Sequence, residues 1–441
     1  MMKYVMVFAM ATIAGFSCKQ PGDYTKFTKD PLLYCKTVKK LNNVVLDNNF
    51  PPMIASRNYA YANIAAYECI AAGDSSYNSL SGQIKHLPAM PKPVAGSQID
   101  FQLAALLSFT RVGNAVTFPE GSLMAYYDEL KQKVLDAGMP EEILASTVAF
   151  SDTIVSSIMA WSKKDNYAQT RSASKFTVRD EDGRWVPTPP MYGSAVEPHW
   201  MEVRPFVLDS PSQCKPVRPP VFDVANKKSA FHVNMTAIKN IGDSLTEEQK
   251  DIADFWDDNP FKLNVSGHVQ FATKKFSPAG HWMNIVGIAA KEAKADFNTT
   301  VAAYAQTSIA LFDGFISCWD EKFRSNYIRP ETAINKYIDQ NWQPYIQTPP
   351  FPSYTSGHST ISAAAAETMT NFFGDKLSFT DTSSLEFGLK SRKLNSFREA
   401  AKEAGMSRLY GGIHYSFDNE AGAISGTNVG KIVIARLKMK K

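Results

Sequence analysis

Three short segments in the last third of the chain carry the cations and histidines that an oxyanion site needs. The first, KFRSNYIRP, places Lys322 and Arg329 seven residues apart. On a continuous helix, seven steps of about 100° return to nearly the same face, so the two cations would converge. Pro330 favours a helix that ends at Arg329. Taken alone, the segment is more typical of a solvated basic face near a helix end.

The second segment, FPSYTSGHST, precedes an alanine-rich run that predicts a helix starting near Ser359. The backbone N–H groups of Ser356 and Gly357 would then have no partner within the helix, and such a helix end binds anions. Glycine lets the main chain approach an anion closely, and the Ser356 hydroxyl is a further donor. His358 would lie beside the anion in the first turn. The structural alternative is a helix cap with an incidental histidine.

The third segment, SRLYGGIHYSFD, places His414 and Asp418 four residues apart, on one face if the segment is helical. The carboxylate would then hold one ring nitrogen and leave the other basic and oriented. Arg408, six residues before His414, is a third cation. An ordinary surface or core contact between the histidine and the aspartate is the alternative.

Together the three segments match a reaction in which a histidine attacks the central atom of a tetrahedral oxyanion. Cations and N–H donors would neutralise charge on the equatorial oxygens. His414 and His358 would then occupy the two axial sides. The sequence contains no acidic cluster suited to Mg²⁺ or Ca²⁺.

The elements that must position these segments are predicted to be helices. Between about Pro51 and Lys164, apolar residues recur at helical spacing, whereas residues 187–220 hold nine prolines and predict an irregular crossing. A second helical region follows from about Leu245. Gly422, Gly426 and Gly430 are spaced four apart in the last helix, which favours close helix packing.

The fold class expected is therefore all-α, built of helical bundles, with the C-terminal bundle carrying the site. The expected division is a signal segment at 1–18, an N-terminal helical domain at 19–186, a proline-rich crossing at 187–244 and the C-terminal helical domain at 245–441. The sequence does not determine an oligomeric state.

The N-terminal sequence MMKYVMVFAMATIAGFSC has the composition of a secretory signal. Ser17 and Cys18 resemble a bacterial lipobox, although Gly15 replaces the usual leucine. We therefore expect an exported protein, either periplasmic or anchored to the outer membrane as a lipoprotein through Cys18. Plain cleavage nearby is the alternative. No later segment has 18 uncharged apolar residues, so the mature body should be soluble.

The remaining composition is that of a globular protein without a nucleic-acid partner. The net charge of +4 over 441 residues gives no basic tract to bind nucleic acid. The later cysteines form no CxxC pair, and Cys35 and Cys69 are either a disulfide or buried thiols. His281, in GHW, has no role in the three segments, and a structural role is expected for it.

The three segments, KxxxxxxRP, SGH and SRxxxGxHxxxD, resemble in order and spacing the motifs of the type 2 phosphatidic acid phosphatase and vanadium haloperoxidase superfamily. Thr355 departs from the proline that many members have before SGH. The resemblance implies that His414 is the phosphatase nucleophile or the axial ligand of vanadium, that Asp418 orients it, and that His358 is the acid–base residue. It implies that the oxygens of phosphate or vanadate are bound by Lys322, Arg329, Ser356, Gly357 and Arg408.

The branch of the superfamily is indicated by the rest of the chain. The membrane lipid phosphatases use several transmembrane helices, which the sequence lacks, and the soluble acid phosphatases are usually much shorter. Phe351, seven residues before His358, and Trp319, three before Lys322, match aromatics on the halide side of chloroperoxidase-like sites. Ordinary core packing is the alternative for both aromatics. Two upstream segments, ADFWDDNP and AGHWMNIV, resemble helix segments of bacterial haloperoxidase-type proteins.

Three functions are consistent with this sequence. The first is a vanadate-dependent haloperoxidase-type enzyme that oxidises halide with hydrogen peroxide. The alternative is an exported acid phosphatase-type phosphomonoesterase, which works through a phosphohistidine and needs no cofactor. The third is a site that binds phosphate or vanadate without turnover, which two histidines argue against. The expected partners are small molecules, either peroxide and halide or a phosphomonoester.

Overall fold

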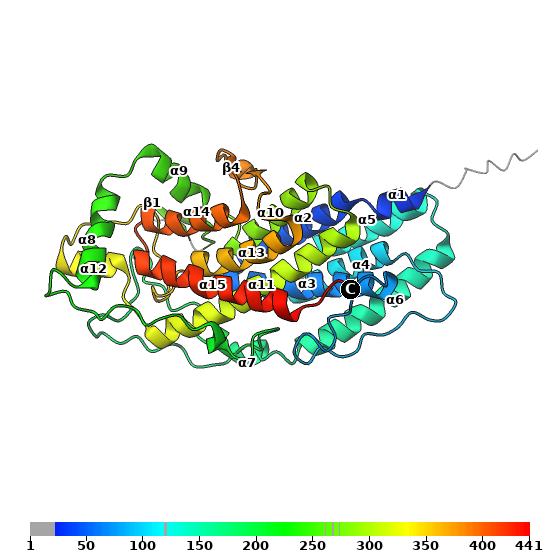
Figure 1. The fold of residues 1–441 in the computed structure, drawn as a ribbon, viewed down its shortest axis with the longest axis horizontal. Coiled ribbons are helices and arrows are strands. Elements are labelled where there is room, and N and C mark those ends of the chain that lie inside the picture. Colours follow the sequence, from blue (N-terminus) through cyan, green and yellow to red (C-terminus); the bar gives the residue numbers. More distant parts are fainter. Residues whose placement is uncertain (1–22, 119–120, 261, 267–268, 273) are drawn as a thin grey trace, which may run out of the picture.

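The computed structural model describes residues 23–441 except 119–120, 261, 267–268 and 273. Most of the described chain is helical, as expected, and Figure 1 shows the helices gathered in one elongated bundle. Helices α1, α5 and α6 lie at one end of this bundle, and α8 and α12 lie at the other. The expected leader and Cys18 lie outside the described residues.

The N-terminal helices begin where proline or a capping side chain favours a start. Asp30 accepts a hydrogen bond from the backbone of Leu32 ahead of α2, and Asp100 caps α4 in the same way through Leu103. The bounds are α1 Tyr24–Thr28, α2 Pro31–Asp47, α3 Pro52–Gly73, α4 Phe101–Val116, α5 Ser122–Asp136, α6 Glu141–Ser162 and α7 Tyr167–Thr170.

The C-terminal helices surround α11, the 29-residue helix Phe297–Ser325, which is buried along most of its length. The others are α8 Ala230–Asp243, α9 Glu247–Phe255, α10 Pro278–Glu292, α12 Pro330–Tyr337, α13 Gly357–Phe373, α14 Phe397–Tyr410 and α15 Ser416–Arg436. Helix α13 packs between α11, α14 and α15. This arrangement brings the ends of α11 and α14 and the starts of α13 and α15 to one region of the bundle (Figure 1).

The two helical halves share a hydrophobic core. Helix α3 packs along both α4 and α11, and α2 packs against α10. One cluster of buried apolar side chains extends from Leu33 in α2 to Met439 near the C-terminus. The division into domains remains a prediction, since this core crosses its boundaries.

The proline-rich region between the two helical halves is irregular, as expected. It ends earlier than the expected boundary at residue 244. It contains the short 3-10 helices Trp200–Glu202 and Pro211–Cys214. Helix α8 then begins at Ala230, within the expected crossing, because the prolines stop at Pro220 and the Ser229 side chain caps the helix. Two antiparallel hairpins complete the fold: β1 Leu263–Ser266 with β2 Val269–Ala272, and β3 Phe379–Asp381 with β4 Arg392–Leu394.

Two further expectations concern the cysteines and the surface. Cys35 and Cys69 are free thiols, which removes the disulfide alternative.

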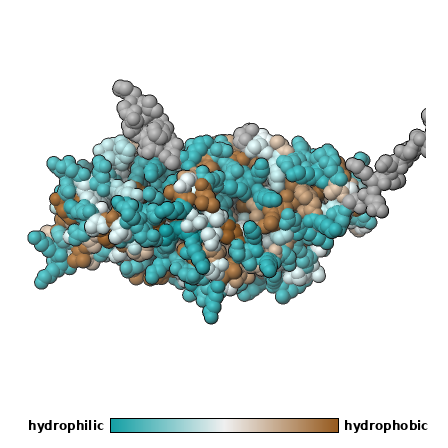
Figure 2. Space-filling view, turned by 90° about the horizontal axis from the view of Figure 1, so that it is seen from above, coloured by the Kyte–Doolittle hydropathy of each residue, from teal (hydrophilic) through white to brown (hydrophobic). Residues whose placement is uncertain are grey.

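Among the described residues, α6 alone is long and apolar enough to cross a membrane by length and composition. It includes the charged Asp152, and it packs against α4 in the bundle. Figure 2 shows hydrophilic residues spread over one face of the molecule, with smaller apolar areas between them.

Candidate active site

Lys322 and Arg329 converge, but not by the helical route that their spacing suggests. Helix α11 ends at Ser325, where Asn326 adopts a left-handed conformation with φ 46°. Arg329 lies outside any helix and caps α12, whose first residue is Pro330. The expectation of one helix through both cations was therefore wrong. Proline is common at the first position of a helix, and Pro330 begins a new helix here instead of following the end of α11.

Both cations are fully buried against the loop that precedes α13. The Lys322 ammonium donates to the carbonyls of Pro352 and Ser353 at 2.8 and 3.0 Å. Arg329 Nε donates to the Phe351 carbonyl at 2.8 Å, and its Nη1 donates to the Ile413 carbonyl at 2.9 Å. The main chain thus fixes both cations without neutralising their charge.

The SGH segment forms the N-terminus of α13, two residues earlier than expected. Ser356 is the N-cap, and its Oγ accepts from the Ser359 backbone N–H. The Ser356 N–H is not free, since it donates to the Asp418 carbonyl at 3.0 Å. The amides of Gly357 and His358 occupy the first turn, where no intrahelical acceptor exists. A Cβ on Gly357 would meet Trp319 at 3.9 Å, so the side-chain position of this glycine lies next to that ring.

His414 and Asp418 form the expected pair, although His414 is not helical. Helix α15 starts at Ser416, and Asp418 is its third residue. The Asp418 carboxylate therefore reaches back over the helix start, where its Oδ2 accepts from His414 Nδ1 at 2.8 Å and from the Tyr415 amide at 3.2 Å. Ser353 Oγ donates to the same oxygen at 2.5 Å. The histidine thus carries its proton on Nδ1 and keeps a lone pair on Nε2.

Each histidine faces a guanidinium. His414 Nε2 lies 3.1 Å from Arg329 Nη1, and His358 Nε2 lies 2.9 Å from Arg408 Nη1. Burial, followed by the nearby cations, holds the pKa of both imidazoles well below its usual range. Both rings are therefore neutral at neutral pH and present unprotonated Nε2 atoms.

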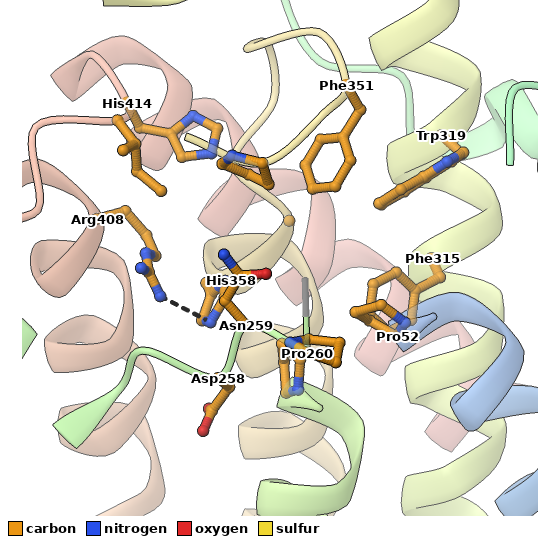
Figure 3. A pocket seen from close by; sticks show the side chains of 14 residues that line it. Pro52, Asp258, Asn259, Pro260, Phe315, Trp319, Phe351, His358, Arg408 and His414 are labelled. Carbon is orange, nitrogen blue, oxygen red and sulfur yellow. Dashed lines mark hydrogen bonds between the residues drawn. The ribbon is translucent and has the colours of Figure 1, made fainter. Parts of the chain in front are cut away.

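These side chains border a pocket that is polar on one side and apolar on the other. Figure 3 shows His414, Arg408 and His358 on one side and Phe351, Trp319 and Phe315 on the other. The rings of Trp319 and Phe351 have centroids 5.0 Å apart. Lys322, Arg329 and Ser356 are buried behind this lining.

The charge of the site is unbalanced. In the described part of the chain, no carboxylate lies within 4 Å of the Lys322 ammonium or the Arg329 guanidinium. Arg408 has only Asp257, at 3.6 Å. Arg329 Nη2 and Arg408 Nε are buried and have no hydrogen-bond partner among the described residues. Burial lowers the pKa of Lys322, and it lowers the pKa of Arg329 to about 9. An oxyanion would compensate these cations and accept from the unused donors.

The sequence reasoning missed one segment of the site. Helix α9 ends at Phe255, so ADFWDDNP is only partly helical, and Asp258, Asn259 and Pro260 line the pocket. Asp-Asn-Pro is a typical turn sequence, and this was the signal that a helix could not continue. Pro52, at the start of α3, also lines the pocket and links it to the N-terminal half.

The chain is similar to a known protein family and to solved structures. The VCPO second helical-bundle domain matches residues 302–440, which include all three motifs. The chain is 41% identical to a solved bacterial vanadium-dependent iodoperoxidase, covering 93% of this chain and 97% of the other, with a TM-score of 0.88. This chain belongs to the vanadium-dependent haloperoxidase family.

Two further solved structures of this haloperoxidase fold are more distant. They are the holo and apo forms of a bacterial vanadium-dependent chloroperoxidase, each 16% identical, with TM-scores of 0.65 and 0.64. They cover 88% of this chain and 93% and 95% of their own. No curated protein matches the sequence. The haloperoxidase membership confirms the expected superfamily, all-α fold and enzyme class, and none of these matches is a phosphatase.

Proposed function

We propose that this haloperoxidase uses hydrogen peroxide to oxidise iodide in preference to bromide and chloride, with vanadate held at His414. The observation that carries the proposal is the buried His414 Nε2 lone pair, set among three cations that lack sufficient carboxylate partners. The preference for iodide follows the 41% identity with the iodoperoxidase, against 16% for the chloroperoxidase.

The residues present fit a vanadate group. His414 Nε2 would be the protein ligand, because Asp418 already holds the proton on the opposite nitrogen. The oxygens of the vanadate would be bound by Lys322, Arg329, Arg408, the Ser356 hydroxyl and the Gly357 amide. When bound, vanadate supplies a Lewis-acidic centre that activates peroxide toward attack by halide.

His358 and Arg408 would handle protons beside this group. His358 Nε2 is unprotonated and accepts from Arg408 Nη1. Once an oxyanion takes the Arg408 hydrogen bond in its place, this nitrogen is able to take a proton from entering peroxide. Arg408 stays charged, because its carbonyl and carboxylate neighbours oppose the loss of its proton. A fixed cation beside a neutral base favours deprotonation of a bound acid.

The aromatic wall offers a route for the halide. Trp319, Phe351 and Phe315 line the pocket opposite the polar side chains. Lys322 and Arg329 lie behind the Phe351 ring, 5.0 and 5.1 Å from its centroid, so an anion at this wall remains close to positive charge. Iodide is larger and more weakly hydrated than chloride, and it therefore loses less hydration free energy at an apolar surface.

The test is a set of steady-state assays on purified protein reconstituted with orthovanadate. We expect kcat/KM with hydrogen peroxide to decrease in the order iodide, bromide, chloride, and the activity to disappear without vanadate. Hydrolysis of a general phosphomonoester is measured in parallel. Chloride oxidation as efficient as that of iodide would contradict the preference, and phosphate release without halide oxidation would contradict the proposed reaction.

We propose in addition that the protein is exported and anchored through a lipid at Cys18. The support is the sequence of residues 1–18, with an uncharged segment after Lys3 and Ser17 before the cysteine. Cells grown with labelled palmitate should incorporate label into the wild-type protein and into a Cys35→Ser control, but not into Cys18→Ser. Soluble periplasmic wild-type protein without label would indicate plain cleavage instead.

A further inference from the structure

A buried group of opposite charges lies beside the site without belonging to the three motifs. His281, in α10, has no exposed surface, and each of its ring nitrogens contacts a carboxylate. Nδ1 lies 2.9 Å from Asp258 Oδ2, and Nε2 lies 2.9 Å from Asp381 Oδ2. A neutral imidazole donates from one nitrogen only, so a ring bonded to two carboxylates is an imidazolium.

This group connects three distant parts of the chain. Asp258 follows α9, His281 lies in α10, and Asp381 ends β3. The His281 ring also stacks on Trp256, with centroids 4.7 Å apart and planes inclined by 24°. Both contacts fix the segment 256–258, whose Asp258 side chain lines the pocket (Figure 3).

The fixed segment in turn contacts Arg408. Arg408 Nη1 donates to the Trp256 carbonyl at 2.5 Å, and Arg408 Nη2 lies 3.6 Å from Asp257 Oδ1. The same Nη1 contacts His358 Nε2 at 2.9 Å. A chain of direct contacts therefore runs from the buried group through residues 256–258 to a cation and a histidine of the site.

We propose that His281 is a positioning residue. By bonding both Asp258 and Asp381, it fixes residues 256–258, and these residues hold Arg408 and His358 in the geometry that binds the oxyanion. The proposal rests on the proposed function for the identity of that oxyanion. His281 itself touches no substrate, and its effect passes through Arg408. A histidine with a purely structural role would stabilise the fold without changing anion affinity.

Removing the imidazolium should disturb the site through electrostatics as well as packing. Two carboxylates would remain buried without their cation, and Asp258 would be free to turn toward Arg408, the guanidinium whose charge it already stabilises. Residues of this kind contact the side chains that bind a metal or oxyanion, but not the ion itself. Their removal changes the affinity for the ion by about 10- to 100-fold.

The test is a double-mutant cycle on orthovanadate binding by the apo-protein, measured by calorimetry. His281→Gln should weaken binding about 10- to 100-fold in the wild-type background. In an Arg408→Ala background the same change should alter the dissociation constant by less than about 3-fold, because the contact through which it acts is absent. Equal effects in both backgrounds would overturn the proposal.

Two further variants separate positioning from loss of fold. Asp165→Asn breaks a buried pair with Arg57 in the N-terminal half, where the atoms are 2.7 Å apart. This control should lower the melting temperature and leave orthovanadate affinity unchanged. Asp381→Asn removes the charge of the His281 partner that lies outside the pocket. This variant is measured in place of His281→Gln if the latter does not fold. Full orthovanadate affinity in folded Asp381→Asn would contradict the proposal.

The same experiment distinguishes this proposal from the proposed function. Binding is measured with orthovanadate and with inorganic phosphate, without peroxide or halide. Non-additive binding together with an absence of halide oxidation would support the positioning role and contradict the proposed reaction. Wild-type protein that binds neither anion would overturn both.

Discussion

At the scale of single residues, the hydrogen bond at His414 Nδ1 prepares Nε2, the reactive nitrogen on the other side of the ring. Asp418 accepts the Nδ1 proton, and burial among cations keeps the ring neutral by lowering its pKa. The Asp418 carboxylate is itself held by Ser353 and by the Tyr415 amide. The lone pair on Nε2 is therefore oriented before any ligand arrives.

Asp418→Asn should consequently reduce orthovanadate affinity by about 10- to 100-fold, and His414→Ala should abolish binding. The amide of asparagine is able to present its NH₂ group to Nδ1, which would move the proton to Nε2 and remove the lone pair. Calorimetry and iodide oxidation measure the two effects. His199→Ala, a change to a partly exposed histidine bonded to Glu202, is the control and should change neither quantity.

His281 should make the stability of the protein depend on pH on the alkaline side. Burial alone lowers the pKa of His281, but Asp258 and Asp381 outweigh it and raise the pKa to about 10. The folded chain then keeps a proton that the unfolded chain releases above about pH 6.5. The stabilisation is complete below that pH and is lost as the pH rises toward 10.

Urea unfolding of the apo-protein between pH 6.5 and 10 measures this contribution. The free energy of unfolding of the wild type should fall by up to about 1.4 kcal/mol per pH unit relative to His281→Gln. Parallel pH profiles of the two proteins would show that His281 is not charged in the folded state.

The residue types of the site were predictable from the sequence, whereas several contacts were not. The three motifs identified Lys322, Arg329, Arg408 and both histidines because their spacing is local. The pairing of His281 with Asp258 and Asp381 joins residues 23 and 100 positions apart, and no local pattern signals such a distance. The packing of α10 against β3 brings His281 to Asp381.

At the scale of elements, the approach of α15 to α13 determines where the site residues lie. Gly422, Gly426 and Gly430 on α15 face α13, as their spacing predicts, and a Cβ on Gly426 would lie 1.9 Å from the Thr360 carbonyl oxygen. The α15 start carries Asp418, and the α13 start carries Ser356 and the residues that follow it. The glycines therefore set the separation of two parts of the site.

Gly426→Ala should separate these helices and destabilise the protein by about 1–3 kcal/mol or more, because a backbone carbonyl cannot rotate away as a side chain does. Orthovanadate affinity should fall as well. Gly314→Ala is a matched control on α11, where a Cβ would meet Ile361 and Ala364 of α13 at ordinary distances of 3.6 and 3.7 Å. The control should be neutral or stabilising, since alanine favours a helix over glycine. Thermal unfolding compares the two variants, and equal melting temperatures would contradict the packing argument.

Helix existence was more predictable than helix ends. The apolar spacing predicted the helices of both halves, but the helix expected to run through Lys322 to Arg329 ends at Ser325. His414, which was helical only as a condition of its pairing with Asp418, precedes the start of α15. Asn326 ends α11 through a left-handed conformation, which only its local backbone reveals. In the site, these helix ends matter more than helix interiors, because Lys322, Arg408 and the cap Ser356 all lie at helix ends.

At the scale of the whole molecule, the N-terminal helices are part of the structure that supports the site. Helix α3 contributes Pro52 to the pocket and packs along α11, which carries Lys322 and Trp319. Every residue of α3 from Pro52 to Ile70 is buried, so this helix is enclosed by the rest of the molecule on all sides. The catalytic motifs occupy one half of the sequence, but the core beneath them draws on both.

A fragment containing residues 245–441 should therefore fail to fold alone, although it holds every motif. It would expose the faces of α11 and α10 that pack against α3 and α2, and an exposed apolar area of this kind leads to aggregation or a loosely packed state. We expect retained helical circular dichroism, lost near-ultraviolet signal and no orthovanadate binding. Co-expression with residues 23–244 should restore binding, because the two pieces together rebuild the shared core. Cooperative unfolding of the isolated fragment with full orthovanadate affinity would show instead that the C-terminal half is an autonomous domain, and that the N-terminal helices serve some purpose other than supporting the site.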